Sequence, residues 1–300
     1  MNRWPIFFRV CLALLLAGVL FPAQASETGE RRGFLYEFCR GERCGLLFGT
    51  IHVGQPEWFP LPPAQQARLD AATRIVLEAD LSRADRVAEA FQRHGFYPPG
   101  QPGLESELEP ELRQRVEAAL PAAGLETSQA WRLKPWLLAS TLTMGQAGAA
   151  GYGVAAAVET QLVAQARGRP VDELEGVEFQ FRLFDAAPRA VQHAFLAETL
   201  AAIDSGEARG EVVGMAQAWL DGDEAAVLAL LQAMQQEASV GGRFTVEQLV
   251  SGRHPYMIER IEYFMAAGGT PLIAVGSLHL FGPQGLIEQL RQRGWRISRV

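Results

Sequence analysis

The chain has very little lysine, few cysteines and, after its first 25 residues, no long apolar run. Lys134 is the only lysine, so arginine supplies nearly all the positive charge, and the formal net charge is -7. This acidic balance argues against general nucleic-acid binding, which needs a basic patch to displace counterions. With 48% apolar and 20% charged residues, the composition is that of an ordinary globular protein. It excludes collagen-like, coiled-coil and broadly disordered chains.

Several common catalytic signatures are also missing. The sequence has no His-Glu-x-x-His zinc helix, no phosphate-binding loop with Gly-Lys and no Gly-x-Ser-x-Gly elbow. Cys11 falls in the N-terminal apolar run, and the other two cysteines flank one short turn. Serine, cysteine and nucleotide chemistries are therefore less favoured than metal-assisted chemistry.

Residues 1–25 have the pattern of a secretory signal peptide. Arg3 and Arg9 supply the positive start, Val10 to Phe21 is apolar, and the segment closes on a small-x-small site at Ala25. The apolar run is shorter than the ~20 residues that a membrane span needs. We expect an exported protein, periplasmic or secreted, that forms a single domain over residues 26–300 and keeps no membrane span once the signal is removed.

The two remaining cysteines, Cys39 and Cys44, are separated by Arg-Gly-Glu-Arg and lie between two apolar segments. They face each other across a predicted hairpin. In an oxidising compartment this favours a disulfide, with a two-cysteine metal site as the alternative.

Strand and helix patterns alternate unevenly along the chain. The strand candidates are residues 34–38, 44–48, 74–77, 171–174, 271–275 and 295–300. Helical spacing covers residues 82–95, 109–120, 128–146, 154–167, 188–204, 211–220, 224–239 and 245–267. We therefore predict an α/β (α+β) fold. A mixed central β-sheet is built from both chain ends and surrounded by helices, with a helical middle insertion at about residues 105–268.

Two matched segments lie near opposite ends of the mature chain. Leu46-Leu-Phe-Gly-Thr-Ile-His52 and Ile273-Ala-Val-Gly-Ser-Leu-His279 share an apolar strand, a glycine, a hydroxyl residue, an aliphatic residue and a histidine. Glycine allows a tight exit from a buried strand. The histidine then emerges at the carboxyl edge of the sheet, where active sites lie in sheets with helical crossovers. Two histidines that only cap strand ends would leave the same pattern.

Glu78 and Glu175 each close an apolar strand candidate. A carboxylate in that position is unfavourable unless something pairs with it. Imidazole and carboxylate together suit a divalent cation, and one glutamate could stay free as a general base. A third acid, Glu159, could face the same site or lie on a solvated helix face.

Arg253 lies at a predicted break within a helical stretch. Its guanidinium could pair with a site glutamate, hold a substrate carbonyl or carboxylate, or lie on the surface. We interpret His254 as a polar loop residue, and His94 and His193 as structural histidines.

At these residues the chain resembles the TraB/GumN family, which is related to the Tiki membrane-bound metalloproteases and, more distantly, to erythromycin esterases and ChaN-type haem-binding proteins. The matching segments are Leu-Phe-Gly-Thr-Ile-His52-Val-Gly, Val-Leu-Glu78-Ala-Asp, Glu-Leu-Glu175-Gly, Arg253-His-Pro-Tyr-Met-Ile and Ala-Val-Gly-Ser-Leu-His279-Leu-Phe-Gly-Pro-Gln-Gly-Leu. The similarity runs from about Phe34 to the end, with specific ends and an unspecific helical middle. Family members usually have Arg-Asn where this chain has Arg253-His254.

The resemblance implies a site built from both chain ends and, for Tiki-like relatives, metal-dependent peptide hydrolysis. Our hypothesis is that His52 and His279, with Glu78 or Glu175, bind a divalent metal such as Mn, Co or Zn that acidifies a bound water. The remaining glutamate transfers the proton, and Arg253 stabilises the oxyanion or orients a carboxylate. The substrate is a peptide or another small molecule. The alternatives are a non-catalytic ligand-binding protein, for example for haem, and an inactive scaffold of the same fold.

Overall fold

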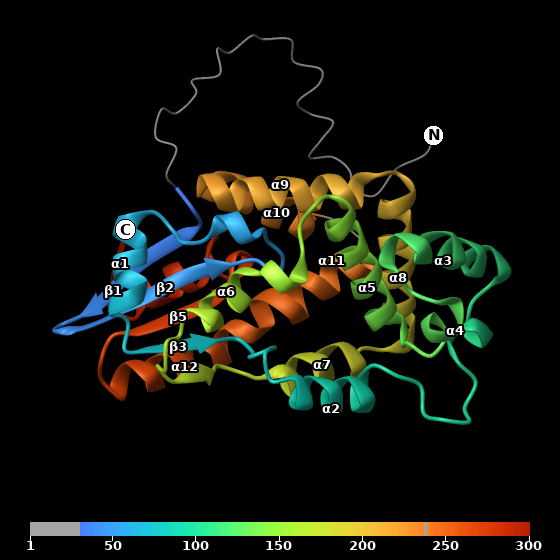
Figure 1. Ribbon diagram of the computed structural model, residues 1–300, viewed down its shortest axis with the longest axis horizontal. Helices are drawn as coiled ribbons and strands as arrows, with labels where there is room; N and C mark the ends of the chain where they lie inside the picture. The colour runs from blue at the N-terminus through green and yellow to red at the C-terminus, as the bar shows by residue number, and fades with distance from the viewer. Residues whose placement is uncertain (1–30, 237–238) are drawn as a thin grey trace, which may run out of the picture.

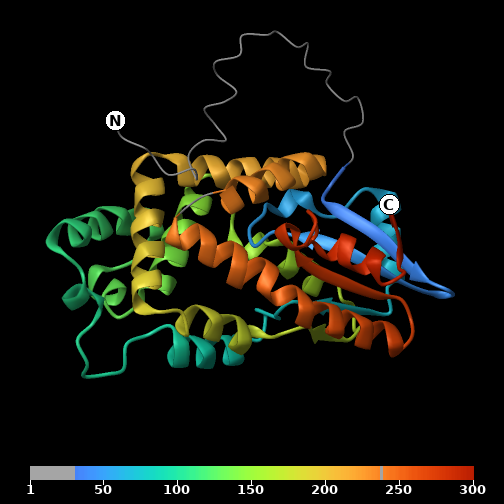
Figure 2. The ribbon, with the colours of Figure 1, turned by 180° about the vertical axis from the view of Figure 1, so that it is seen from behind.

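The computed structural model describes residues 31–236 and 239–300. The predicted signal peptide lies outside these residues. The molecule is elongated, with a β-sheet at one end and a group of helices at the other (Figure 1). Long helices run along the molecule between these two ends and cover the sheet, as the reverse view in Figure 2 shows for α12 (His254–Ala266).

Six strands form one mixed sheet in the order β4-β3-β5-β2-β1-β6. The strands are β1 (Phe34–Arg40), β2 (Arg43–Thr50), β3 (Arg74–Leu77), β4 (Val171–Glu173), β5 (Pro271–Gly276) and β6 (Arg296–Arg299). Both chain ends contribute strands, as the sequence predicts. The four neighbours β4, β3, β5 and β2 are parallel, whereas β1 pairs antiparallel with β2 and β6. The carboxyl ends of the four parallel strands therefore meet at one edge, which faces the helical end (Figure 1).

The helices lie mainly between β3 and β5 in the chain. The α-helices are α1 (Pro63–Ala71), α2 (Ala84–His94), α3 (Pro110–Ala123), α4 (Thr127–Ala130), α5 (Pro135–Ala149), α6 (Val158–Ala164), α7 (Val177–Asp185), α8 (Arg189–Asp204), α9 (Glu207–Asp221), α10 (Glu224–Gln236), α11 (Val240–Phe244), α12 (His254–Ala266) and α13 (Leu286–Gln292). The short helices are η2 (Pro56–Trp58), η3 (Leu104–Glu107), η4 (Val154–Ala156), η5 (Thr245–Val250, a π-helix), η6 (Ser251–Arg253) and η7 (Ser277–His279).

Buried apolar side chains form two main clusters. The larger one packs the sheet against helices from both halves of the chain, and a second one fills the helical end around α3, α5 and α8. Trp219 of α9 ties the helical layer to the sheet, because its fully buried indole donates to the main-chain oxygen of Gly49 at 2.8 Å and stacks on Trp58. The sheet edge that carries the predicted site residues is thus held in place by packing on both sides.

The structure confirms the predicted strands to within about two residues at each end. Several predicted helices are instead divided. Residues 128–146 split at Pro135, which begins α5, and residues 245–267 form a π-helix, a 3-10 turn and then α12. Helices α1 and α7 were not predicted.

Cys39 and Cys44 form a disulfide between directly opposed residues of β1 and β2, with Cα atoms 4.2 Å apart. This confirms the favoured interpretation of the two cysteines. Within residues 31–236 and 239–300, no helix has both the length and the apolar character needed to cross a bilayer.

Candidate functional site

The predicted site residues come together beyond the carboxyl ends of the four parallel strands. His52 follows β2, Glu78 follows β3, Glu175 follows β4 and His279 follows β5. Thr50 of β2 lies opposite Gly276 of β5, so the two Gly-x-x-His segments leave the sheet side by side. The sequence argument from strand ends therefore placed all four side chains correctly at one edge.

The small residues of the two motifs allow this close approach. A Cβ on Gly49 would lie 2.7 Å from the Leu280 side chain and 3.0 Å from the Ser277 hydroxyl oxygen. The Ser277 hydroxyl donates to the main-chain oxygen of Thr50 at 2.9 Å, which joins one motif to the other. The Gly276 N–H donates to Glu78 Oε1 at 2.6 Å. Each motif thus contributes main-chain and hydroxyl groups to the site as well as its histidine.

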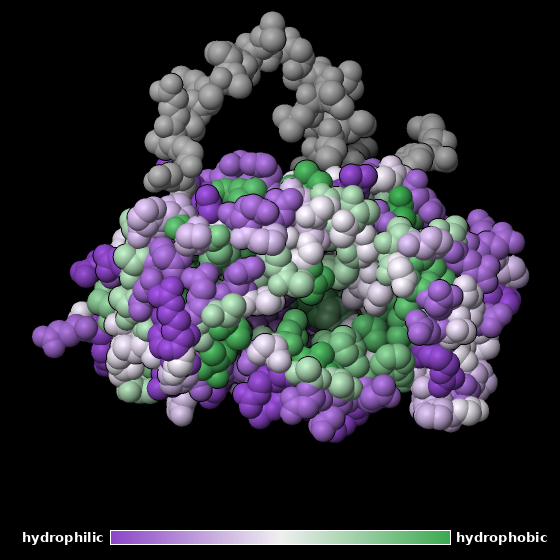
Figure 3. Space-filling model, viewed as in Figure 1, coloured by the Kyte–Doolittle hydropathy of each residue, from purple (hydrophilic) through white to green (hydrophobic). Residues whose placement is uncertain are grey.

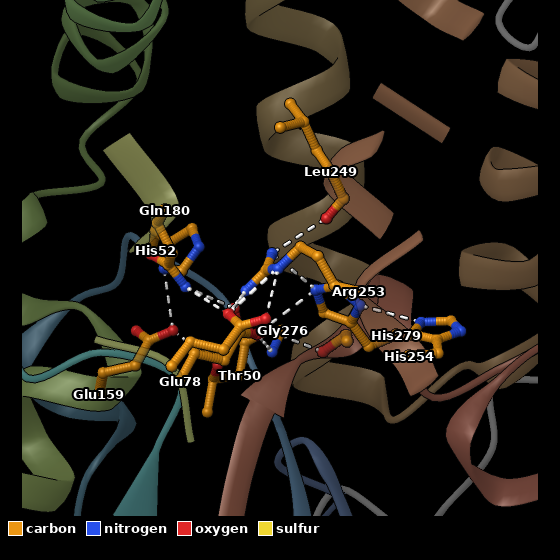
Figure 4. A network of polar contacts seen from close by, with 12 residues as sticks. Thr50, His52, Glu78, Glu159, Gln180, Leu249, Arg253, His254, Gly276 and His279 are labelled. Carbon is orange, nitrogen blue, oxygen red and sulfur yellow. Dashed lines mark hydrogen bonds and ion pairs between the residues drawn. The ribbon is translucent and has the colours of Figure 1, made fainter. Parts of the chain in front are cut away.

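Arg253 reaches the site from a distorted helical segment. The π-helix η5 and the turn η6 precede α12, and π-helical turns often occur at functional sites. Gly252 is required in this turn, because a Cβ there would lie 2.3 Å from the main-chain oxygen of Glu247. The break predicted around Arg253 is therefore present, and it directs the guanidinium toward the strand ends (Figure 4).

The guanidinium of Arg253 lies between the two glutamates. Its Nε donates to both carboxylate oxygens of Glu175 at 3.1 Å, and Nη2 donates to both Glu78 and Glu175. Its Nη1 donates to the main-chain oxygen of Leu249 at 3.0 Å and to Nε2 of His279 at 3.2 Å. The side chains of Arg253, Glu78 and Glu175 are only 10%, 8% and 0% exposed. Of the roles open to Arg253, the structure shows the pairing with site glutamates.

His279 belongs to a buried chain of hydrogen bonds that runs from the Arg253 guanidinium to a main-chain oxygen. The first of these groups can only donate and the last can only accept. A guanidinium only donates, so His279 Nε2 accepts from Arg253, and His279 Nδ1 then donates to His254 Nε2 at 3.0 Å. His254 Nδ1 in turn donates to the main-chain oxygen of Gln284 at 2.7 Å. Burial lowers the pKa of His279 to about 3 and also lowers that of His254. Both rings are therefore neutral at pH 7.

His52 is different, because its ring is 62% exposed and pairs with another acid. Its Nδ1 lies 2.9 Å from Oε1 of Glu159, which also accepts from the Thr50 hydroxyl at 2.6 Å. The Glu159 carboxylate raises the pKa of His52 to about 9. The imidazole is therefore charged at neutral pH. In Figure 4, His52 and His279 lie on opposite sides of Glu78 and Arg253, and Figure 3 shows a hollow with an apolar rim near the middle of this face.

Burial and the neighbouring charges shift the pKa values of the three site carboxylates in different directions. Burial raises the pKa of Glu78, but Arg253, the charged His52 and the Gly276 N–H outweigh it and hold that pKa well below its usual value. Glu159 is likewise lowered in pKa, mainly by His52 acting against burial. For Glu175, burial dominates and raises the pKa in spite of Arg253. Glu159 also keeps one oxygen, Oε2, buried without a hydrogen-bond partner.

The four predicted metal ligands do not converge on one point in this arrangement. In the described part of the chain, no group of three His, Cys, Asp or Glu side chains is placed to hold a metal ion. The reason is visible in the contacts: the guanidinium lies between the two glutamates, His279 Nε2 accepts from it, and His52 is paired with Glu159. A metal bound by the predicted residues would have to displace Arg253.

Three side chains of the site were not given their role from the sequence. Glu159 was an open candidate, and it pairs with His52. His254 was interpreted as a loop residue but is 2% exposed and holds His279. Gln180 of α7 donates to Glu78 at 3.0 Å and to Glu175 at 3.3 Å, and nothing in its sequence context indicates this. His94 and His193 lie away from this site, in ion pairs with acidic side chains.

Comparison with known proteins shows the family of the chain. The chain is 28% identical over 150 residues to the uncharacterized protein YbaP of Escherichia coli K12 and to that of Shigella flexneri. The match covers 49% of this chain and 54% of each relative, so it spans about half of their length. No solved structure matches the chain. A family model, TraB/PrgY/gumN, matches residues 34–299, which include every residue of the site described above. The chain therefore belongs to the TraB/PrgY/gumN family.

Proposed function

We propose that the chain is a hydrolase that cleaves peptides or similar amides at the carboxyl edge of its parallel strands. The observation that carries this proposal is the pair formed by His52 and Glu159. An exposed imidazole bound to a largely buried carboxylate is an arrangement that can hold and transfer a proton at a substrate. The cluster around Arg253 lies directly behind it and fixes the strand ends.

The chemistry follows from the charge on His52. Glu159 occupies Nδ1, so Nε2 is the nitrogen that a bound substrate can reach. Because the pKa of His52 is raised to about 9, the ring is a proton donor at neutral pH. When a water molecule attacks the carbonyl carbon, the ring can stabilise the developing oxyanion and protonate the leaving nitrogen. The neutral ring then takes up the proton that the attacking water loses, so the carbon–nitrogen bond breaks and a carboxylic acid and an amine are released, while Glu159 holds the ring in position. The Thr50 hydroxyl donates to Oε1 of Glu159 and so fixes the orientation of that carboxylate.

A pocket that is linked to the Arg253 cluster through Leu249 would suit a substrate with an apolar group. The pocket has a volume of about 380 Å³ and lies between α5, α8, α9 and η5, with Phe195, Val212 and Leu249 among its lining residues. Leu249 connects it to the site, because its main-chain oxygen accepts from Arg253. We therefore favour peptides with an apolar side chain near the bond that is cleaved. If residues 1–25 direct export, these peptides are met outside the cytoplasm.

The sequence-based hypothesis adds a divalent metal held by His52, His279, Glu78 and Glu175. Since these side chains do not converge as they stand, the mechanism above uses only groups of the chain itself. Metal dependence stays a prediction, and the assay below includes it by treating the protein with EDTA and then adding Mn, Co or Zn.

The test is hydrolysis of a library of blocked peptides by the disulfide-bonded chain, with products identified by mass spectrometry. We expect His52→Ala to reduce the rate at least about 100-fold, the lower range for loss of general acid–base catalysis. His193→Ala is the matched control, since His193 also pairs with a glutamate, Glu107, at 2.9 Å but lies in α8 away from the site. Equal rates for the wild type and His52→Ala would refute the proposal.

A further inference from the structure

The position between Glu78 and Glu175 is one that a cation must fill. Both carboxylates are almost completely buried and contact the same guanidinium, and two buried negative charges so placed are very unfavourable without a positive charge between them. In this chain the positive charge is a side chain. Arg253 contacts both carboxylates, and the nearest oxygen and nitrogen atoms of all three residues lie within hydrogen-bonding distance.

The guanidinium also has no donor left for a substrate. Arginine has five N–H groups, one on Nε and two on each terminal nitrogen. Nε is used by Glu175, Nη1 by the Leu249 main-chain oxygen and His279, and Nη2 by Glu78 and Glu175. An oxyanion role, which the sequence left open for Arg253, needs at least one donor aimed at the substrate. The contacts leave none.

We propose that Arg253 is a positioning residue whose guanidinium serves as the built-in cation of this site, in the place where the predicted divalent metal would bind. It offsets part of the negative charge of Glu78 and Glu175, and it donates a hydrogen bond to His279 Nε2. The wild-type site is then complete without a metal ion. Removal of the guanidinium would free two carboxylates and one imidazole nitrogen, a donor set that suits a divalent cation.

This inference deepens the proposed function and depends on it only in taking this cluster as the active site. Its readouts are metal content and unfolding, so they do not require a known substrate. A failure to find peptide hydrolysis would leave the role of Arg253 unaffected. In the same way, a failure of the metal-binding experiment would leave the proposed hydrolysis untouched.

The experiment compares the wild type with Arg253→Met. Both proteins are dialysed against MnCl₂ or ZnCl₂, freed of unbound metal and analysed for metal content and thermal unfolding. We expect the wild type to retain no metal and to unfold at the same temperature with or without it. Arg253→Met should unfold roughly 10 °C lower, because two buried charges lose their partner, and it should take up about one equivalent of metal that raises its Tm again.

Arg260→Met is the matched control. Arg260 lies in α12, the helix that directly follows Arg253, but its guanidinium donates to the main-chain oxygens of Leu174 and Glu173. This variant should bind no metal. The proposal is overturned if the wild type binds stoichiometric metal that Glu78→Gln abolishes, or if a folded Arg253→Met binds none.

A second variant covers the case in which Arg253→Met does not fold. In Glu78→Gln/Glu175→Gln/Arg253→Met, the two buried negative charges are removed together with the positive one. If Arg253 serves to neutralise the two glutamates, this triple variant folds and unfolds at a higher temperature than Arg253→Met. A triple variant that is as unstable as Arg253→Met would overturn the proposal.

Discussion

Acidification from pH 7 to pH 4.5 should weaken the folded chain through His279. The ring is buried, accepts from Arg253 and donates to His254, so a second proton on Nε2 would face the guanidinium at 3.2 Å, although Glu78 Oε1 lies 3.5 Å away. Burial is the main reason that its pKa falls to about 3, and the charge of Arg253 acts in the same direction, against Glu78. In the unfolded chain the same ring takes up a proton near pH 6.5. Between these two values the unfolded state binds more protons than the folded state, so stability falls as the pH falls.

The size of the effect follows from the two pKa values. At pH 4.5 the unfolded ring is two pH units below its pKa of about 6.5, while the folded ring, with a pKa of about 3, is still neutral. Each unit corresponds to about 1.4 kcal/mol, so the loss relative to pH 7 is about 2.5 kcal/mol. Because the ring is only 4% exposed, solvent does not screen this effect.

Guanidinium chloride unfolding at the two pH values, followed by tryptophan fluorescence, measures this loss. His279→Asn removes the titrating ring, so its stability should fall by about 2.5 kcal/mol less than that of the wild type between pH 7 and pH 4.5. His193→Asn, a change of a half-buried histidine, should behave like the wild type. If His279→Asn and the wild type lose the same stability on acidification, the neutral state assigned to His279 is wrong.

Three further predictions concern His52, the disulfide and Trp219. The His52 ring should titrate near pH 9 in NMR spectra, and Glu159→Gln should lower that pKa toward about 6.5; a wild-type value near 6.5 would refute the ion pair. Replacement of Cys39 and Cys44 by alanine should cost about 2 kcal/mol in denaturant unfolding, since the loop that they close is short, and no loss would show that the disulfide constrains little. Trp219→Ala should lower the free energy of unfolding by roughly 4 kcal/mol, because it leaves a cavity at a fully buried site and removes the hydrogen bond to Gly49 of β2. Trp219→Phe should lower it clearly less, and equal losses for the two variants would refute the anchoring role.

The sequence predicted the sheet and the edge that carries the site because both depend on short-range patterns. Apolar runs that end in glycine or glutamate mark buried strands, and parallel neighbours necessarily bring such ends together. The same reasoning failed for α7, whose residues Val177 to Phe181 alternate between apolar and polar, a pattern typical of a strand. Its helical form is set by packing of Phe181 against Phe91 of α2 and Trp136 of α5.

The partners within the site could not be predicted, because they depend on distances across the fold. Glu159 is 107 residues from His52, and Gln180 reaches two glutamates from a helix that the sequence did not indicate. His254 directly follows Arg253, yet its function depends on Gln284 and His279, which lie in other elements. Residue types and strand ends thus located the site, but only the tertiary contacts assign a proton or a charge to each member.

The two Gly-x-x-His motifs show how far equal patterns can differ in chemistry. After Gly276 the chain enters the turn η7, which places His279 inside the molecule against Arg253, whereas after Thr50 the chain continues without a helix and leaves His52 exposed. One ring meets a guanidinium and stays neutral, and the other meets a carboxylate and stays charged. The observed difference gives the histidines separate tasks: His279 supports the buried charges, and His52 is the ring that a substrate can reach.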